Sequence, residues 1–495
     1  MITPNESESN VDWFIFTAGI LMIIGVTIPI VLFPDWSESV ISVAFNFLTR
    51  ELGFVYVVVA DVILLFVVAV GVSPWGRTRL GDSPPAYSRF SWAAMLFCAG
   101  IGASLIYWGA TEWAFYYTAP PFGVTPGSDE AVRWATSYGI FHWGPIGWAL
   151  YCLPTIALCC SYYLRGIPVL RLSAACASVL GNRTDHWPAR MIDLVFVIGL
   201  LGTAATGLGL GTSVVASAAT RLVGVADGFG MQFTVILLIT GVIAVSVYKG
   251  MDKGIKVLSV INASLALVFI AFVLVAGPTM FIIEMGVSAV GHVLANFVNM
   301  ATWNDSDFVA DWTVFYWAWW LALGPFVGMF VCKISQGRTI REVIFGMLGW
   351  GSLGCALFFV VLGNYALQME LEGSYPVVEQ AVALSPSAAI AGITEQLPFG
   401  SFWLVYLAII GLIFAATTYD SASYTLAAAA TRELKTDEHP ARWHRVFWAI
   451  SLGILPAALL FLGGLKVLQT ASVVASIPLM GVYFILAAST VRMLR

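Results

Sequence analysis

The chain alternates between long apolar runs and short polar segments. Most of the apolar runs reach or exceed twenty residues, which is about the length that a helix needs to cross a bilayer. A transmembrane β-barrel would instead show much shorter segments in which apolar and polar residues alternate. The pattern therefore predicts an all-α polytopic membrane protein. The twelve predicted spans are 12–33, 52–73, 90–118, 134–163, 191–221, 231–248, 256–277, 312–332, 342–367, 400–430, 444–464 and 468–491.

Composition and charge placement sharpen this prediction. The chain has 495 residues, of which 59% are hydrophobic and 10% charged, with a mean hydropathy of +0.88. These values are not those of a soluble domain. Nineteen of the 23 Lys and Arg residues lie in one set of loops. Because positively charged loops stay in the cytoplasm, both termini are expected to be cytoplasmic, in a bacterial-type plasma (inner) membrane. The polar residues before the first span carry no positive stretch, so no cleaved signal peptide is expected.

The sequence contains no pattern typical of catalysis. Its seven cysteines lie within spans or cytoplasmic segments and form no metal-ligand pattern with histidine. Disulfides and a zinc site are therefore not expected. A phosphate-binding loop, an HExxH pattern and a GxSxG pattern are also missing from the sequence. We expect neither an enzyme nor a cofactor.

Two spans contain residues that disfavour a regular helix. Ala99–Ser104 (AGIGAS) interrupts the third span, and Leu323–Gly328 (LGPFVG) interrupts the eighth, five spans later. Interrupted helices at corresponding positions of two five-helix units predict a transporter built from inverted repeats. The N–H groups around Gly100, Gly102 and Ser104 are then candidates for binding a substrate carboxylate. The alternative is that the small residues only allow close helix contacts.

Aromatic residues are concentrated in the same eighth span. Phe315–Trp320 (FYWAWW) lies deep in an apolar run, whereas tryptophan usually marks the ends of a membrane helix. Stacked indole faces bind a quaternary ammonium ion without burying a counter-charge. This cluster predicts a cavity for such a cation; a bulky packing face or an aromatic belt is the alternative.

The fourth span carries a second aromatic cluster. Trp143, Trp148 and Tyr151 are spaced by five and three residues, which places them near one face of a helix. Together with Trp319 and Trp320 they predict a cage around a methylated ammonium group. Structural packing of these rings is the alternative.

The tenth span offers hydroxyl groups for an ion. Thr417 and Thr418 are neutral oxygen donors that suit Na⁺ when main-chain carbonyls of a broken helix complete the site. Hydrogen bonding of the hydroxyls to the preceding turn is the alternative. Asp420 follows them and is a functional candidate because it is a carboxylate within a span. A bond to a neighbouring hydroxyl or backbone N–H, or a position near the cytoplasmic end of its helix, is the alternative.

Two local features lie outside the spans. Residues 283–299 have helical periodicity with a few polar positions, which predicts an amphipathic helix on the external surface, followed by a polar turn at Asn304, Asp305 and Asp307. Thr339 and Glu342 form a Thr-x-x-Glu pattern that predicts a capping box at the start of the ninth span.

The motifs together resemble the betaine–choline–carnitine transporter family over about 12–490. The resemblance is strongest in three runs, and four further segments add to it. The three runs are Trp312–Trp320 (WTVFYWAWW), Gly324–Gly328 (GPFVG) and Ile334–Glu342 (ISQGRTIRE), and the further segments are Phe141–Trp143, Met251–Ser259, Ala276–Thr279 and Asp420–Ser423.

The resemblance implies a leucine-transporter-like fold, usually assembled as a homotrimer. Two extra N-terminal helices then precede two inverted five-helix repeats. The implied units are 1–88 (tail and helices 1–2), 89–280 (first repeat), 281–311 (external linker helix) and 312–495 (second repeat).

The resemblance also implies uptake of betaines and related trimethylammonium or dimethylsulfonium solutes. By motif position, Trp143, Trp148, Tyr151 and Trp320 match the family's aromatic box, with Trp319 close by and Trp317 on the exit side. In sodium-coupled members, hydroxyls matching Thr417 and Thr418 join carbonyls matching Ala99 and Ile101 around one Na⁺. Leu323 stands where well-studied osmolyte symporters carry another Trp.

The resemblance leaves two transport modes open. Some members exchange substrates without sodium and hold a positive side chain where this chain has Ala263, which supplies no charge. We therefore expect sodium-coupled symport, with sodium-independent exchange as the alternative. A ligand sensor or a channel is an alternative from another functional class. Neither the soluble output domain of a sensor nor the continuous polar pore of a channel is recognisable in the sequence.

Overall fold

The computed structural model describes residues 11–167, 169–181, 186–249, 252–303, 307–432, 439–463 and 465–495. These residues form a bundle of helices with short connections and two isolated β-bridges. Asn304 and Asp305 of the predicted polar turn lie outside the described residues, as does Met251 at the start of one family motif.

All twelve predicted spans are helical. The helices that correspond to them in order are α1 (Trp13–Leu32), α3 (Gly53–Val72), α4 (Arg89–Ala99) with α5 (Ala103–Thr118), α6 (Asp129–His142) with α7 (Pro145–Cys159), α10 (Trp187–Val223), α11 (Phe229–Lys249), α12 (Asp252–Ala276), α14 (Val314–Ile334), α15 (Ile340–Gly346) with α16 (Ser352–Phe358) and α17 (Asn364–Glu372), α19 (Gly400–Ala429), α20 (Arg442–Leu462) and α21 (Leu465–Leu494).

The remaining elements connect or extend these helices. They are α2 (Pro34–Asn46), η1 (Phe47–Glu51), η2 (Pro74–Arg77), η3 (Pro121–Gly123), η4 (Cys160–Leu164), α8 (Leu172–Ala175), α9 (Ala177–Leu180), α13 (Thr279–Thr302), η5 (Val309–Thr313), η6 (Met347–Gly351), η7 (Phe359–Gly363), η8 (Glu379–Leu384) and α18 (Pro386–Glu395).

By length and apolar composition, eleven helices in the described part of the chain are able to cross a membrane, or twelve spans if the bent pair α4–α5 is one of them. One of the eleven is α13, which the sequence predicts on the external surface. The predicted amphipathic periodicity of α13 is confirmed, because its buried residues Ile282, Gly286, Ala289 and Val293 form one stripe. Its position on the external surface stays a prediction.

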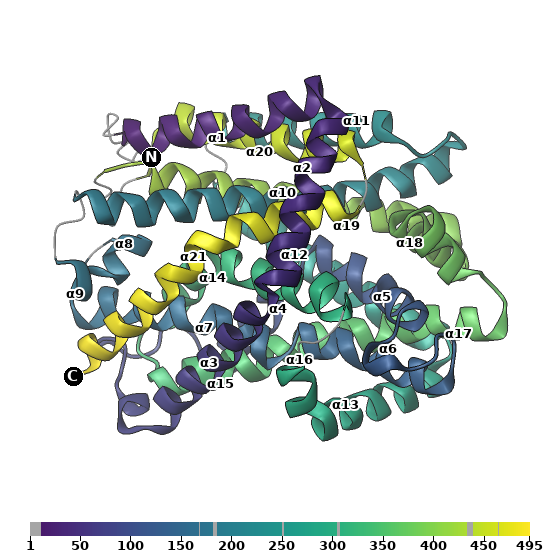
Figure 1. Ribbon diagram of the computed structural model, residues 1–495, viewed down its shortest axis with the longest axis horizontal. Helices are drawn as coiled ribbons and strands as arrows, with labels where there is room; N and C mark the ends of the chain where they lie inside the picture. The colour runs from purple at the N-terminus through teal and green to yellow at the C-terminus, as the bar shows by residue number, and fades with distance from the viewer. Residues whose placement is uncertain are drawn as a thin grey trace.

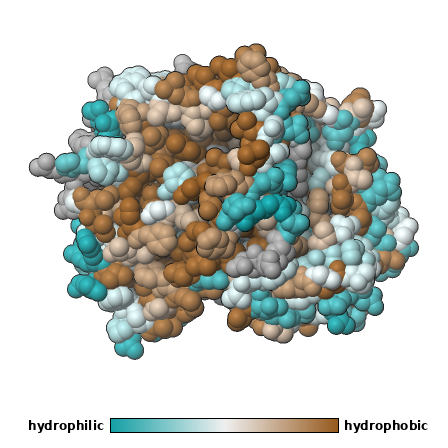
Figure 2. Space-filling model, in the orientation of Figure 1, coloured by the Kyte–Doolittle hydropathy of each residue, from teal (hydrophilic) through white to brown (hydrophobic). Residues whose placement is uncertain are grey.

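The surface of the molecule is strongly apolar. Leu21 and Leu32 of α1, for example, are 62% and 63% exposed. Figure 2 shows hydrophobic side chains over much of one face, with polar side chains at its left and right edges and in a patch right of its centre. A soluble protein rarely exposes apolar patches of this extent. This chain is therefore an all-α polytopic membrane protein.

The interior is organised around two central helices. Helix α10 packs against α19, α20 and α21, and α14 packs against α7 and α21. Most residues of both helices are buried. Candidate site residues on α14 therefore face other helices rather than lipid.

The predicted interruption of the third span is confirmed. Helix α4 ends at Ala99, α5 begins at Ala103, and the two helices are bent by 60° relative to each other. Gly102 between them has an extended backbone (φ −152°, ψ 176°). The break leaves the first N–H groups of α5 without partners inside that helix.

The predicted interruption of the eighth span is wrong. Helix α14 continues through Gly324 and Pro325. Proline at position 325 cannot donate to the carbonyl of Leu321 four residues earlier, but the Tyr483 hydroxyl of α21 lies 2.9 Å from that carbonyl oxygen. A donor from a neighbouring helix therefore replaces the missing backbone hydrogen bond, and the helix need not unwind.

The fourth span is interrupted where no break was predicted. Helix α6 ends at His142, and α7 begins at Pro145 after Trp143 and Gly144. Pro145 at the first position of α7 suits a helix start, because a proline there loses no hydrogen bond. This break places Trp143 at the junction between two helices.

The predicted capping box is confirmed. The Thr339 hydroxyl accepts from the Glu342 backbone N–H at 3.2 Å, and the Glu342 carboxylate accepts from the Thr339 N–H at 2.9 Å. The adjacent Arg341 donates to the carbonyls of Gly71 and Val72 at the end of α3. Part of the family motif at 334–342 therefore joins two helix ends.

Candidate functional site: a buried aromatic cluster beside a broken helix

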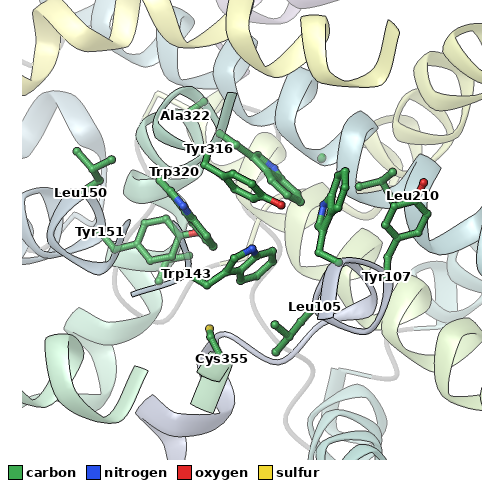
Figure 3. Packing of buried hydrophobic residues seen from close by; sticks show 14 of the residues in the cluster. Leu105, Tyr107, Trp143, Leu150, Tyr151, Leu210, Tyr316, Trp320, Ala322 and Cys355 are labelled. Atoms are coloured by element: carbon green, nitrogen blue, oxygen red, sulfur yellow. The ribbon is translucent and has the colours of Figure 1, made fainter. Parts of the chain in front are cut away.

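The rings of the predicted cage meet between α7 and α14. Trp143 at the α6–α7 junction, Trp148 and Tyr151 of α7, and Trp319 and Trp320 of α14 are each at most 5% exposed. Figure 3 shows Trp143, Tyr151 and Trp320 turned toward one another inside the bundle. We call these five residues the aromatic cluster.

The rings of the aromatic cluster contact each other nearly at right angles. The ring centroids of Trp143 and Trp320 lie 4.8 Å apart with an interplanar angle of 88°, and those of Tyr151 and Trp320 lie 5.0 Å apart at 80°. Trp148 contacts Tyr151 in the same way at 5.5 Å. Trp319 stacks beside Trp320 at 6.1 Å. Such edge-to-face contacts fix ring orientations more firmly than area burial alone.

The α6–α7 break holds Trp320 in place. The carbonyl of His142 at the end of α6 accepts a hydrogen bond from the Trp320 indole N–H at 3.0 Å. Carbonyls at a helix end need partners from outside the helix. The unpredicted break thus supplies the acceptor that orients one ring of the cluster.

Glycines allow the neighbouring backbones to approach these rings. A Cβ atom at Gly147 would lie 2.9 Å from the Trp320 indole nitrogen, and one at Gly351 would lie 2.4 Å from the Trp148 ring. A Cβ atom at Gly100 would lie 3.0 Å from Trp148. The α4–α5 break therefore directly contacts the aromatic cluster. This contact joins residues far apart in the chain, so it could not be predicted from the spacing of residues in the sequence.

Trp317 lies apart from the aromatic cluster. It is fully buried, and its ring contacts Phe141 at 5.8 Å and His142 at 5.8 Å. No ring contact joins it to a cluster member within the described residues. At about 100° per residue, Trp317 and Trp319 point to nearly opposite sides of α14, whereas Trp320 lies only about 60° from Trp317. Packing of Trp317 against Phe141 and His142, and not helix spacing, therefore separates it from Trp320. Its assignment to substrate binding stays a prediction.

The residues predicted to bind a carboxylate lie at the start of α5. Gly100, Gly102 and Ser104 are half-buried, and a Cβ at Gly102 would meet nothing closer than 4.0 Å, the Ser104 hydroxyl. The free N–H groups of a helix start, together with its dipole, favour an anion. The geometry is compatible with the predicted role, which stays a prediction.

The four residues predicted to bind sodium lie on α19 and at the α4–α5 break, and α19 and α5 contact each other. The Thr417 side chain is buried, and its hydroxyl lies 2.9 Å from the Ile413 carbonyl oxygen of its own helix. Thr418 is exposed, Ala99 is half-buried and Ile101 is buried. A hydroxyl that donates to the preceding turn keeps its lone pairs, so the sodium site stays a prediction.

Asp420 pairs with a basic side chain of the next helix. Its carboxylate lies 3.6 Å from Arg445 of α20. Asp193 of α10 is likewise paired, with Arg171 at 3.1 Å. Asp420 thus pairs across α19 and α20, and Asp193 of α10 pairs with the residue that precedes α8 (Leu172–Ala175).

A buried polar network borders the aromatic cluster, and its role was not predicted. Glu112 and Tyr116 of α5, His142 of α6 and Tyr316 of α14 are all fully buried. Both tyrosine hydroxyls donate to the Glu112 carboxylate, and the Tyr116 hydroxyl lies 3.0 Å from His142 Nδ1. The spacing of Glu112 and Tyr116 by four residues was the one signal in the sequence.

A cavity of about 740 Å³ opens beside this network. Its aromatic walls reach the network directly, since Phe308 contacts the Tyr116 ring at 5.0 Å and Trp312 contacts it at 5.1 Å. Asp307 and Asp311 also line the cavity. Because Asp307 pairs with Arg50, the aromatic walls are the feature of this mouth that favours a cation.

Comparison with known proteins places the chain in a family. Residues 14–495 match the family described as BCCT, betaine/carnitine/choline family transporter. The chain is 32% identical to a carnitine transporter of Acinetobacter baumannii, with 93% of this chain and 82% of the relative covered. It is 33% identical to a high-affinity choline transport protein of Escherichia coli, with 97% and 72% covered. It is 32% identical to the glycine betaine transporter OpuD of Bacillus subtilis, with 93% and 90% covered.

These matches extend over nearly the whole chain and agree with its polytopic fold. The family and the curated relatives are transporters, so this chain is a membrane transporter and not an enzyme. The chain belongs to the betaine/carnitine/choline family of transporters.

Proposed function

We propose that this transporter imports a quaternary-ammonium or betaine-type solute by sodium-coupled symport. The observation that carries the proposal is the aromatic cluster: buried indole and phenol rings from two packed helices converge beside a broken helix. The names of the relatives, which include carnitine, choline and glycine betaine transporters, support this substrate class.

The rings of the aromatic cluster bind the methylated cation. Each ring face contributes roughly 1–2 kcal/mol to binding a desolvated onium group. Three or four faces therefore give useful affinity even after the losses that accompany binding. Trp143, Trp148, Tyr151 and Trp320 form the walls, and Trp319 extends them.

Binding requires the cluster to open. The centroids of Trp143 and Trp320 are only 4.8 Å apart, so a trimethylammonium group fits between the faces only when α7 and α14 separate or the rings turn. The substrate reaches the cluster from the cavity lined by Asp307, Asp311 and Trp312. Closure of the rings over the cation then excludes water and shields the substrate during transport.

The α4–α5 break couples the ion to the substrate. Na⁺ held by Thr417, Thr418 and the carbonyls of Ala99 and Ile101 links α19 to the break. The break in turn contacts Trp148 through Gly100. An ion that binds the substrate-ready arrangement more tightly shifts the population toward it. A zwitterionic substrate places its carboxylate at the N–H groups of 100–104.

Sodium-independent exchange of one substrate for another is the second candidate mode, which the family resemblance leaves open.

We further propose that the chain assembles as a homotrimer in a bacterial plasma membrane with both termini in the cytoplasm. The uneven distribution of Lys and Arg supports that orientation. Size measurement of the detergent-solubilised protein tests the trimer.

Binding of a panel of onium compounds tests the aromatic site. Trp143→Ala and Trp320→Ala are each expected to weaken binding of the best ligand about tenfold or more, as loss of one desolvated ring predicts. Trp187→Ala is the control, because Trp187 is 67% exposed. Unchanged affinity in both cluster variants would refute the aromatic site.

Uptake into proteoliposomes tests the coupling ion. With an inward Na⁺ gradient and no internal substrate, accumulation is expected; with Na⁺ replaced by K⁺, it should be lost. Uptake that needs internal substrate and ignores Na⁺ would establish exchange instead. Uptake that needs neither would contradict both modes.

A further inference from the structure

The buried network beside the aromatic cluster contains a carboxylate without a strong base. Glu112 is fully buried, and the basic group near it is His142, whose Nδ1 lies 3.6 Å from the carboxylate. Within the described residues, the ion pairs of Glu112 include no Lys or Arg. A buried carboxylate normally requires a cation or several hydrogen-bond donors.

Both oxygens of the Glu112 carboxylate accept hydrogen bonds from tyrosine hydroxyls. The Tyr116 hydroxyl donates to Oε1 at 2.5 Å, within the range of charge-assisted O–H···O⁻ bonds, and the Tyr316 hydroxyl donates to Oε2. With the Tyr116 proton used in this way, His142 Nδ1 donates to the Tyr116 oxygen at 3.0 Å. Nε2 then accepts from the Thr313 hydroxyl at 3.0 Å.

Every polar atom of this arrangement has a partner when the imidazole is neutral. The network then carries one negative charge, that of Glu112. Tyr138, whose ring lies 5.3 Å from the His142 ring and 5.9 Å from the Tyr116 ring, adds no charge at neutral pH.

The charged network directly adjoins the aromatic cluster. The Tyr316 ring, whose hydroxyl contacts Glu112, lies 6.0 Å from the Trp143 ring and stacks at 6.5 Å from Trp320. His142 contributes both its ring to the network and its carbonyl to the Trp320 indole N–H. Figure 3 shows Tyr316 beside Trp320 and above Trp143.

We propose that Glu112 is a specificity-determining residue that makes the site prefer substrates with a net positive charge over zwitterions. This inference rests on the proposed function, since it assumes that an onium group occupies the aromatic cluster. The carboxylate attracts the onium group of both substrate types. Only a zwitterion brings a second, negative group that the same carboxylate repels.

The size of the effect follows from Coulomb's law. For unit charges roughly 10 Å apart at an effective dielectric constant of about 20, the interaction corresponds to an affinity change on the order of tenfold. A zwitterion loses much of this gain, because its two charges have opposite signs. Glu112 acts through Tyr316 and does not need to contact the substrate.

Binding of choline, a monocation, and glycine betaine, a zwitterion with the same head group, tests the inference. Glu112→Gln is expected to weaken choline binding about tenfold and to leave glycine betaine binding unchanged or only slightly weaker. Glu112→Asp keeps the charge and should retain the preference. Equal weakening of both ligands by Glu112→Gln would overturn the inference and indicate a purely structural role.

Two further variants separate this inference from the proposed function. Trp320→Ala should weaken choline and glycine betaine alike, because both carry the trimethylammonium group; no effect on either would refute the aromatic site itself. Glu395→Gln is the matched control, since Glu395 is partly exposed and pairs with Arg221. The ratio of choline affinity to glycine betaine affinity in this variant should equal that of the wild type.

A replacement variant covers misfolding of Glu112→Gln. Glu112→Met has similar length and removes the charge without introducing a new polar group, and the same fall in the choline-to-betaine ratio is expected. The inference would be overturned if any folded variant without the carboxylate kept the wild-type ratio of choline affinity to glycine betaine affinity. Failure of the wild type to bind either compound would overturn it together with the proposed function.

Discussion

The third and eighth spans carry similar helix-breaking residues, but only the third is broken. Gly100 and Gly102 separate α4 from α5 with a 60° bend, whereas α14 runs without interruption through Gly324 and Pro325. The difference lies in the neighbours. In α14, the Tyr483 hydroxyl donates a hydrogen bond to the freed Leu321 carbonyl. At the third span, Gly100 lies close to Trp148 and Cys355, and the helix ends there.

A single hydroxyl serves two proline sites at this junction. Pro154 of α7 leaves the Leu150 carbonyl free, as Pro325 leaves that of Leu321. The Tyr483 hydroxyl lies 2.9 Å from each of these carbonyl oxygens. Its one proton is therefore shared between them. The helices that carry the aromatic cluster, α7 and α14, are joined here by α21.

The largest effect is expected from Gly324→Ala. The new Cβ would lie 2.1 Å from the Tyr483 hydroxyl oxygen and 2.9 Å from the Leu150 carbonyl oxygen. Because a backbone atom is involved, we expect a loss of unfolding free energy near the upper end of about 1–3 kcal/mol. Thermal unfolding in detergent measures it. Gly349→Ala, with nothing within 4 Å of its Cβ, should be almost neutral.

The next effect is expected from Tyr483→Phe. It leaves two buried carbonyls without their donor, so we expect a loss of about 1–3 kcal/mol in unfolding free energy. In a Pro325→Ala background the Leu321 carbonyl regains a backbone partner, and the loss should be smaller. Equal losses in the two backgrounds would mean that the hydroxyl does not compensate for the proline.

Gly100→Ala should affect binding more than stability. Its Cβ would lie 2.7 Å from the Cys355 sulfur and 3.0 Å from the Trp148 ring, both of which are side chains that can shift. We expect a loss of about 1 kcal/mol in unfolding free energy. Onium affinity should fall several-fold because Trp148 moves, as ligand titration would show. If the variant is destabilised but its onium affinity is unchanged, the α4–α5 break does not influence binding at the aromatic cluster.

The smallest effect is expected from Pro325→Ala. Helix α14 is already continuous, so the change in unfolding free energy should stay within about 1 kcal/mol, and uptake in proteoliposomes should be retained. Loss of uptake in a stable variant would show that transport requires α14 to unwind at this proline. In that case the two spans would be functionally alike despite their different structures.

Local sequence was sufficient for several features. The helices at the twelve predicted spans follow from apolar run length, although α13 and not α12 is among those long and apolar enough to cross a membrane in the described part of the chain. The capping box of Thr339 and Glu342 follows from a four-residue pattern, and the break at 100–102 follows from glycine. The aromatic residues of the fourth and eighth spans were recognised as one cluster by their chemistry. Each of these depends on residues close together in the chain.

Other features depend on partners distant in sequence. Glu112 looks like an isolated carboxylate in its span, and only packing of α5 against α6 and α14 surrounds it with His142 and Tyr316. The separation of Trp317 from its neighbours is also decided by which helix covers each face of α14.

The amino-acid sequence by itself determined that this chain is a bundle of membrane helices with aromatic residues concentrated in two spans, because bilayer crossing requires long apolar runs and the family motifs are local. Only the tertiary structure decided which breaks form and which carboxylate lies beside the aromatic cluster. The physical reason is that an unpaired carbonyl or a buried carboxylate is stabilised by whichever side chain packs against it, and in this chain Tyr483 and Tyr316 come from other helices.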